Sequence, residues 1–78
     1  MDLYEKVLKI IIEQTECEEL KNDFDIDLIE NDIIDSLAFI NIINSLNDEF
    51  NIEIQPTEVS PDSWKTVKSI TDLVSSLL

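Results

Sequence analysis

The segment Ile33-Ile34-Asp35-Ser36-Leu37-Ala38-Phe39-Ile40 joins a long acidic region to the most apolar predicted helix of the chain. Asp35 and Ser36 are residue types that commonly cap a helix N-terminus. Apolar residues then recur at steps of three and four, which is helical spacing. These residues are Leu37, Ile40, Ile43, Leu46 and Phe50. The pattern predicts a helix from Ser36 to about Phe50 with this face toward the core, ending at Asn51.

Ser36 is therefore expected at or just before the first turn of this helix. A group carried on its hydroxyl faces unpaired backbone N–H groups and the positive end of the helix dipole, an environment that favours a phosphate. On the tripeptide alone, the simpler interpretation is that Asp35 and Ser36 only cap the helix. The remainder of the sequence has to decide between these two interpretations.

The length and charge of the chain narrow its possible functions. Seventy-eight residues form one domain, residues 1–78, and a chain of this size buries only about 60% of the surface that it exposes when unfolded. One modest core is expected, without a deep active-site cleft. Eighteen acidic and five basic residues give a net charge of −13, which repels nucleic acid and anionic membranes. Partners with basic surfaces are expected instead.

The residue types that are missing exclude several kinds of site. The chain has one cysteine, Cys17, no histidine and no glycine. It cannot form an intrachain disulfide, a zinc ligand set is not expected, and neither a Ser-His or Cys-His nucleophile pair nor a Gly-rich phosphate loop is possible. The sequence predicts a protein that is not itself an enzyme and has no metal site. With no signal peptide and no span of about 20 apolar residues, a cytoplasmic location is expected.

Residues before the central segment form a predicted helix and a predicted loop. Tyr4, Val7, Leu8 and Ile11 share one helical face, which predicts a helix from Asp2 to about Gln14 with Asp2 as the cap. Residues 15–35 carry half of the acidic groups and lack helical periodicity, so they are read as a long loop. Apolar residues are expected to dock this loop on the helices, namely Phe24, Ile26, Leu28, Ile29, Ile33 and Ile34.

The acids of this loop do not have the pattern of a calcium site. Asp23, Asp25 and Asp27 occupy alternate positions, as in the first part of an EF-hand loop. That loop also needs glycine at its sixth position and glutamate at its twelfth, where this chain has Leu28 and Ile34. Dedicated calcium binding is not predicted.

Residues after the second helix predict a short helix and a last long helix. Asn51 to Gln55 are read as extended, and Ser60-Pro61-Asp62 predicts a one-turn helix ending near Trp64, which anchors it to the core. Thr66 is the predicted cap of the last helix. The residues that this helix is expected to bury are Val67, Ile70, Val74 and Leu77. The predicted fold class is all-α, with three main helices, one short helix and a long first loop.

This order of elements resembles the acyl and peptidyl carrier proteins over nearly the whole chain. Asp35-Ser36-Leu37 is similar to the carrier attachment motif, in which the serine hydroxyl receives 4′-phosphopantetheine from coenzyme A. The resemblance implies a small four-helix bundle, a covalent cofactor on Ser36, and roles for Asp35 and Leu37 in the motif. It further implies a monomer that bears acyl or aminoacyl groups as thioesters and catalyses nothing itself.

The partners that the resemblance implies are a phosphopantetheinyl transferase, an adenylating enzyme that loads the acyl or aminoacyl group, and an acceptor or condensing enzyme. In the pattern typical of fatty acid carriers, acidic residues lie along the second helix. This chain has Ala38, Asn41 and Asn47 at such places. Apolar contact with partners is therefore expected through Ala38, Phe39 and Ile42, although Phe39 is equally compatible with a core position.

Within the family, Glu30-Asn31-Asp32-Ile33-Ile34-Asp35-Ser36 looks more like the D-alanyl carrier proteins of teichoic acid modification, or a related stand-alone aminoacyl carrier. Carriers commonly have a glycine shortly before the motif. Here Asn31-Asp32 has to make that turn, and both residue types tolerate a positive φ. The cargo stays open, with lipid, polyketide and peptide pathways as alternatives.

A different class of function is also compatible with the residues. An acidic helical adaptor would bind a basic protein through residues 16–35 and carry no prosthetic group. In that case Ser36 is a helix cap and nothing more.

Overall fold

The computed structural model describes residues 2–23 and 25–78, and the regular secondary structure within these is all helical, without a strand. The three α-helices are α1 (Leu3–Thr15), α2 (Ser36–Phe50) and α3 (Val67–Leu77). Three short 3-10 turns are η1 (Glu18–Lys21), η2 (Pro56–Glu58) and η3 (Pro61–Trp64). The all-α prediction is confirmed, and η3 is the predicted one-turn helix. The turns η1 and η2 were not predicted.

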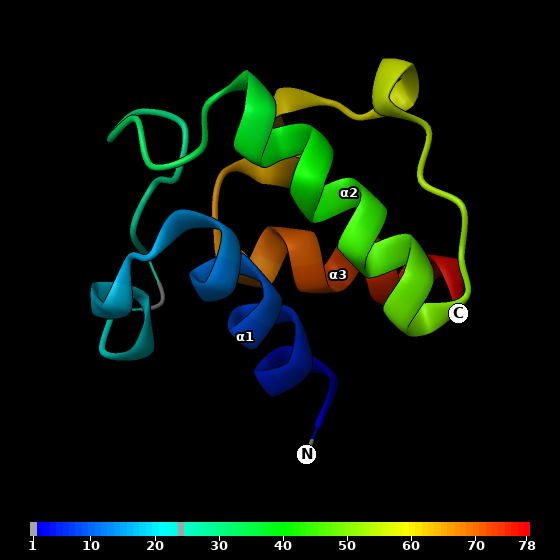
Figure 1. The fold of residues 1–78 in the computed structure, drawn as a ribbon, viewed down its shortest axis with the longest axis horizontal. Coiled ribbons are helices and arrows are strands. Elements are labelled where there is room, and N and C mark those ends of the chain that lie inside the picture. Colours follow the sequence, from blue (N-terminus) through cyan, green and yellow to red (C-terminus); the bar gives the residue numbers. More distant parts are fainter. Residues whose placement is uncertain (1, 24) are drawn as a thin grey trace.

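Helix α1 packs against both α2 and α3, as Figure 1 shows. The acidic loop leaves the C-terminal end of α1, runs along one side of the molecule and leads into the N-terminus of α2 (Figure 1). The molecule measures 28 × 27 × 18 Å along its principal axes. No helix in residues 2–23 and 25–78 has both the length and the apolar character needed to cross a membrane.

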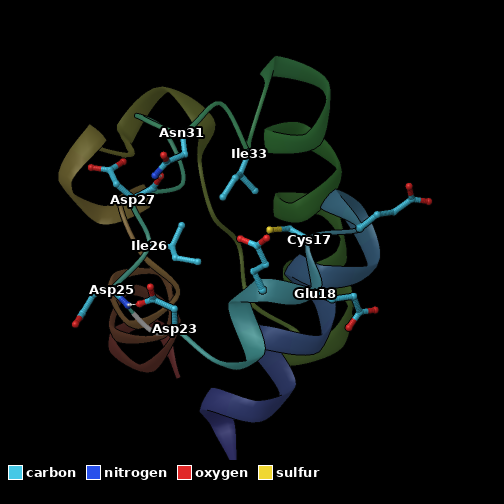
Figure 2. A pocket seen from close by; sticks show the side chains of 10 residues that line it. Cys17, Glu18, Asp23, Asp25, Ile26, Asp27, Asn31 and Ile33 are labelled. Carbon is cyan, nitrogen blue, oxygen red and sulfur yellow. Dashed lines mark hydrogen bonds between the residues drawn. The ribbon is translucent and has the colours of Figure 1, made fainter.

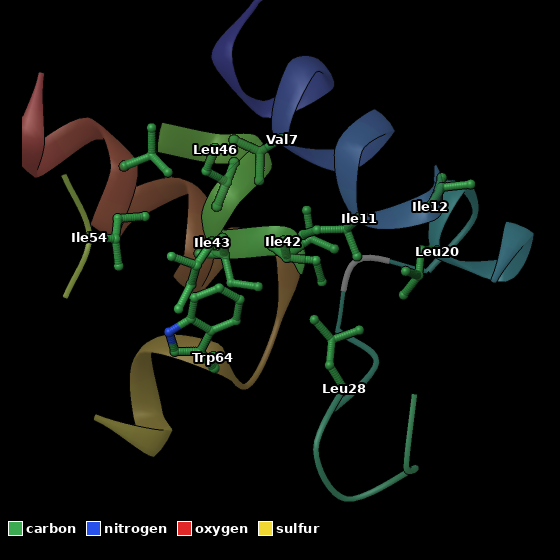
Figure 3. Close-up of a cluster of buried hydrophobic side chains, with 13 residues drawn as sticks. Val7, Ile11, Ile12, Leu20, Leu28, Ile42, Ile43, Leu46, Ile54 and Trp64 are labelled. Carbon is green, nitrogen blue, oxygen red and sulfur yellow. The ribbon is translucent and has the colours of Figure 1, made fainter. Parts of the chain in front are cut away.

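One hydrophobic core joins the three α-helices and the two segments that connect them (Figure 3). These segments are the acidic loop, residues 16–35, and the last linker, residues 51–66. Its buried members are Val7, Ile11, Ile12, Leu20, Leu28, Ile42, Ile43, Leu46, Ile54, Trp64, Val67, Ile70 and Val74. Trp64 is 2% exposed, so its predicted role as an anchor is confirmed. The core therefore includes residues of both linkers as well as of the helices.

Each α-helix begins where the sequence predicts a cap. The Asp2 carboxylate accepts a hydrogen bond from the Glu5 N–H at 2.8 Å, and the Asp35 carboxylate accepts one from the Ala38 N–H at 2.7 Å. The Thr66 hydroxyl accepts from the Ser69 N–H at 3.1 Å. Caps of this kind each contribute about 1 kcal/mol. The predicted starts of all three helices are thus confirmed.

Among residues 2–23 and 25–78, three take a left-handed backbone, although the chain has no glycine. Glu16 ends α1 with φ 59°, Asn51 ends α2 with φ 54°, and Asp32 turns the loop with φ 54°. The conformations of Asn51 and Asp32 agree with the sequence analysis. That of Glu16 was not foreseen, because a glutamate has no particular tolerance for this region.

Leu28 holds the acidic loop in place. Its side chain is fully buried, its N–H donates to the Lys65 carbonyl at 2.6 Å, and its carbonyl accepts from the N–H groups of Ile33 at 3.0 Å and Ile34 at 3.2 Å. Of the other predicted docking residues, Ile26, Ile33 and Ile34 are half-buried and Ile29 is exposed, whereas Phe24 lies outside the described residues. The loop is docked, as predicted.

The buried face of α2 differs from the predicted one in its first half. Leu37 is 70% exposed and Ile40 is 42% exposed, whereas Ile42 is completely buried. Apolar residues occupy almost every position of the first two turns, so spacing alone allows two overlapping faces. The burial of Ile42 shows that the face carrying Ile42, Ile43 and Leu46 is turned toward the core, where α1 packs on α2. The predicted burial of Leu77 is also wrong, because this residue lies in the last turn of α3, beyond the core.

Candidate functional site

Ser36 is the first residue of α2 and is exposed to solvent. Its hydroxyl makes no hydrogen bond with any residue that the structure describes. An enzyme approaching from outside can therefore reach this oxygen. The position at the helix end is the one that the sequence predicts.

Asp35 fixes the backbone on which Ser36 stands. Its extended backbone, with φ −97° and ψ −176°, and its bond to the Ala38 N–H make it the N-cap of α2. No acidic residue lies in the first turn of the helix. Beyond the Asp35 cap, the positive end of the helix dipole at Ser36 therefore faces no further carboxylate in the first turn, which suits an anionic group on the hydroxyl.

A groove of about 610 Å³ begins at Ser36 and extends between the start of α2 and the segment that includes η3. Its wall is largely apolar and consists of Ile29, Ile34, Phe39, Ile40, Val59, Pro61 and Trp64, with Asp35, Ser36 and Ser60 as its polar members. The rings of Phe39 and Trp64 meet edge to face, with centroids 4.7 Å apart. The groove offers a largely apolar surface beside the exposed hydroxyl, with Asp35 as its one charged lining residue.

The predicted partner-interface residues have different environments. Ala38 and Phe39 are half-buried, and Phe39 contributes to the groove wall. Ile42 is fully buried in the core and cannot contact a partner, so that prediction is wrong. The side chains exposed beside Ser36 are instead Leu37, from the motif, and Ile40. Ile40 was missed because the helical pattern assigned it to the core.

A larger and more polar hollow, of about 940 Å³, lies within the acidic loop. Its lining residues come from positions 16–19, at the start of η1, and from positions 23–33. Figure 2 shows Ile26 and Ile33 pointing toward its middle, while the Asp25 carboxylate points outward. Several of its acids stabilise turns. Asp23 accepts from the Asp25 N–H at 3.0 Å, and Asp27 accepts from the N–H groups of residues 29 and 30 at 3.0 and 2.8 Å. These Asx turns explain why a loop so rich in carboxylates is ordered.

The acids do not gather into a metal site in the part of the chain that the structure describes. No three His, Cys, Asp or Glu side chains lie there as a set that could hold an ion. Burial, and secondly the charge of the Asp25 carboxylate, raise the pKa of Tyr4 on α1. Tyr4 is not among the residues that line the groove at Ser36.

Comparison with known proteins identifies relatives over the full chain. The family model described as "Phosphopantetheine attachment site" matches residues 5–74. The D-alanyl carrier protein of Leuconostoc mesenteroides is 31% identical over 78 residues, which cover 100% of this chain and 99% of that protein. The D-alanyl carrier proteins of Bacillus licheniformis and Enterococcus faecalis are each 30% identical over 77 residues, 99% of both chains.

Proposed function

The chain belongs to the family of proteins with a phosphopantetheine attachment site, and we propose that Ser36 is the residue on which this carrier bears its 4′-phosphopantetheine. The single observation that carries the proposal is the exposed Ser36 hydroxyl at the N-terminus of α2, inside the Asp-Ser-Leu motif. The matched residues 5–74 include this position. Members of this family act as carriers and leave the chemistry to partner enzymes.

The residues around Ser36 fit the group. A phosphate on the hydroxyl lies at the positive end of α2, where backbone N–H groups and the dipole favour negative charge. The apolar groove beside Ser36 provides a surface for the remainder of the arm. When bound, the group supplies a terminal thiol that holds acyl or aminoacyl units as thioesters. Asp35 positions the serine by capping the helix.

Attachment takes place on a separate transferase. The Ser36 oxygen forms a bond to the phosphorus that bears the pantetheine, the phosphoanhydride bond of coenzyme A breaks, and the nucleotide part leaves with the electron pair. The hydroxyl proton passes to a base on the transferase. Solvent exposure of Ser36 is the property that this step requires.

D-alanine is the cargo that we favour. The support is the full-length similarity to D-alanyl carrier proteins at about 30% identity. The first turn of α2 carries no acid, which supports a carrier whose partners do not depend on an acidic helix. An adenylating enzyme in the cytoplasm would load the amino acid, and an acceptor enzyme would take it up.

Partner enzymes meet the surface around Ser36. Leu37 and Ile40 expose apolar side chains there, and the nearby Ala38 is half-buried. We expect these side chains to be covered when a partner binds, with the acidic loop meeting a basic rim. The alternative of an adaptor without a prosthetic group has no support from the family match.

Intact mass spectrometry tests the attachment site. The purified chain is incubated with coenzyme A, magnesium and a broad-specificity phosphopantetheinyl transferase. The wild type and Ser75→Ala, a control in the exposed last turn of α3, are expected to gain the mass of one phosphopantetheinyl group. Ser36→Ala is expected to gain nothing. Modification of Ser36→Ala to the wild-type extent contradicts the assignment of this residue.

A second assay tests the cargo. The modified protein is incubated with ATP, a D-alanine-adenylating enzyme and either D-alanine or L-alanine. A D-alanyl mass gain that hydroxylamine removes is expected with the D isomer. Absence of loading on a fully modified protein argues against D-alanine and leaves the carrier function standing.

A further inference from the structure

Trp64 carries a buried hydrogen-bond donor that the fold does not use. The residue is 2% exposed, and its indole Nε1 has no acceptor among the described residues and no contact with solvent. A buried indole N–H normally finds a partner. Leaving one without an acceptor costs about 1–3 kcal/mol. A native structure that keeps such a donor calls for a reason.

The position of Trp64 beside the groove offers a reason for this unpartnered donor. Its side chain lines the groove that starts at Ser36, and Phe39 of α2 braces its ring from one edge. Of the other polar groups of the groove, the Ser36 hydroxyl is the proposed attachment point, and the remaining two are engaged locally. The Asp35 carboxylate accepts from the Ala38 N–H, and the Ser60 hydroxyl lies 3.1 Å from that of Ser63. Among the residues that line the groove, Trp64 thus has a side-chain donor without a protein acceptor.

The chemistry of the donor defines that guest. An indole N–H only donates, so the guest has to present an acceptor. The net charge of −13 disfavours a carboxylate there. A neutral carbonyl oxygen on an otherwise apolar chain fits best, since the wall around Trp64 is apolar and its volume of about 610 Å³ is that of a small-molecule site.

We propose that the Trp64 Nε1–H donates a hydrogen bond to a carbonyl oxygen of the arm carried on Ser36, or of its thioester, and so holds the arm in the groove. This inference rests on the proposed function, which places such carbonyls at the mouth of the groove. Tethering raises their local concentration there far above that of a free ligand. Because Nε1 is sealed in the unmodified chain, side chains of the groove wall shift to admit the acceptor.

The chain offers an unusually direct probe, because Trp64 is its single tryptophan. Its indole gives one ¹H–¹⁵N signal, which we would record for the unmodified, phosphopantetheinylated and D-alanylated protein. The expected result is a downfield shift of the indole proton and slower hydrogen exchange on modification. A change that appears with the free arm assigns the acceptor to an arm amide, and one that appears only after loading assigns it to the thioester.

A variant supplies a second measurement. Trp64→Phe keeps an aromatic ring and removes the donor, and its fold is checked by circular dichroism. Arm-induced shifts of backbone amides in the groove report the fraction of protein with a docked arm. In Trp64→Phe these shifts are expected to become smaller, because the ratio of docked to free arm falls about fivefold. The same groove shifts in Trp64→Phe and wild type would overturn the inference.

The indole signal has its own contradicting outcome. An identical indole shift and exchange rate in all three forms of the wild type would also overturn the inference. Failure of the proposed function is recognised separately, because mass spectrometry then detects no modification of Ser36 and no arm is present to be tested.

Discussion

The rings of Phe39 and Trp64 lie with their centroids 4.7 Å apart and their planes at 69°, an edge-to-face contact between α2 and η3. Phe39 comes three residues after Ser36, and Trp64 comes three residues before α3 begins. This contact therefore links the start of the motif helix to the last linker, and both rings line the groove.

Replacing Phe39 by leucine is expected to lower the free energy of unfolding by about 1 kcal/mol, because the aromatic contact contributes about 0.5–1.5 kcal/mol beyond its buried area. Urea unfolding followed by the fluorescence of Trp64 measures this. Leu37→Ala on the same helix is the control, since its side chain is 70% exposed and its loss should cost less than about 0.5 kcal/mol. Equal effects of the two changes would contradict the packing described.

Asp35 is expected to have a structural role that can be separated from its charge. Asp35→Ala removes the acceptor for the Ala38 N–H and should destabilise the protein by about 1 kcal/mol. Asp35→Asn keeps a good cap and should unfold at nearly the wild-type urea concentration. Transferase assays on the folded Asn variant then measure what the charge alone contributes. An Asn variant as unstable as the Ala variant would refute the capping role.

Glu16 is expected to be replaceable with a gain in stability. Its left-handed φ of 59° costs a residue with a Cβ about 1–2 kcal/mol, which glycine avoids at some cost in chain entropy. Glu16→Gly should therefore raise the free energy of unfolding by about 0.5–1 kcal/mol. Glu13→Gly, in the regular part of α1, should lower it by a similar amount. Thermal and urea unfolding of both variants decide the sign.

Binding of a loading enzyme is expected to be weakened by salt but not abolished. The surface beside Ser36 presents Leu37 and Ile40 and no acid in the first turn of α2. At about 0.5 M salt the Debye length is about 4 Å, so charge pairs at the rim are screened while apolar contacts persist. Calorimetric titrations at low and high salt measure this. Asn41→Asp is the comparison variant, and its binding should respond more steeply, whereas abolished wild-type binding at high salt would contradict the expectation.

Tyr4 is expected to lower stability in alkaline solution. Burial, with a further contribution from the Asp25 carboxylate, raises the pKa of Tyr4 in the folded protein. As the pH rises past about 10, the unfolded chain loses this proton first and is favoured. The stabilisation is thus fully present below that pH and is lost above it. Urea midpoints measured across this range should fall less in Tyr4→Phe than in the wild type, since lysine titration is common to both.

The helix boundaries could be predicted because their signals are local. Asp2, Asp35 and Thr66 are cap residues followed directly by helical spacing, and Asn51 tolerates the conformation that ends α2. The buried face of α2 could not be predicted, because apolar residues surround its first turns and only the packing of other helices selects among them. For this reason Ile42, expected at the partner surface, is buried, and Leu37, expected in the core, is exposed.

The candidate site also has one part that local sequence predicts and another part that depends on packing. Ser36 and Asp35 are adjacent in the sequence, so a motif identifies them. The groove is made from side chains of the loop, the helix and the last linker, such as Ile34, Phe39 and Val59. Their meeting depends on long-range packing that no local pattern encodes. The unused donor of Trp64 likewise becomes visible only when its surroundings are known.

The hydrogen bond from the Leu28 N–H to the Lys65 carbonyl has a consequence for the order of events during biosynthesis. A ribosome that has released Ser36 but not Lys65 presents the serine on a loop without its anchor, and without the Trp64 ring that closes the groove. We therefore expect a nascent chain at that stage to be modified more slowly than the finished protein, and most of the prosthetic group to be added after translation has passed residue 65.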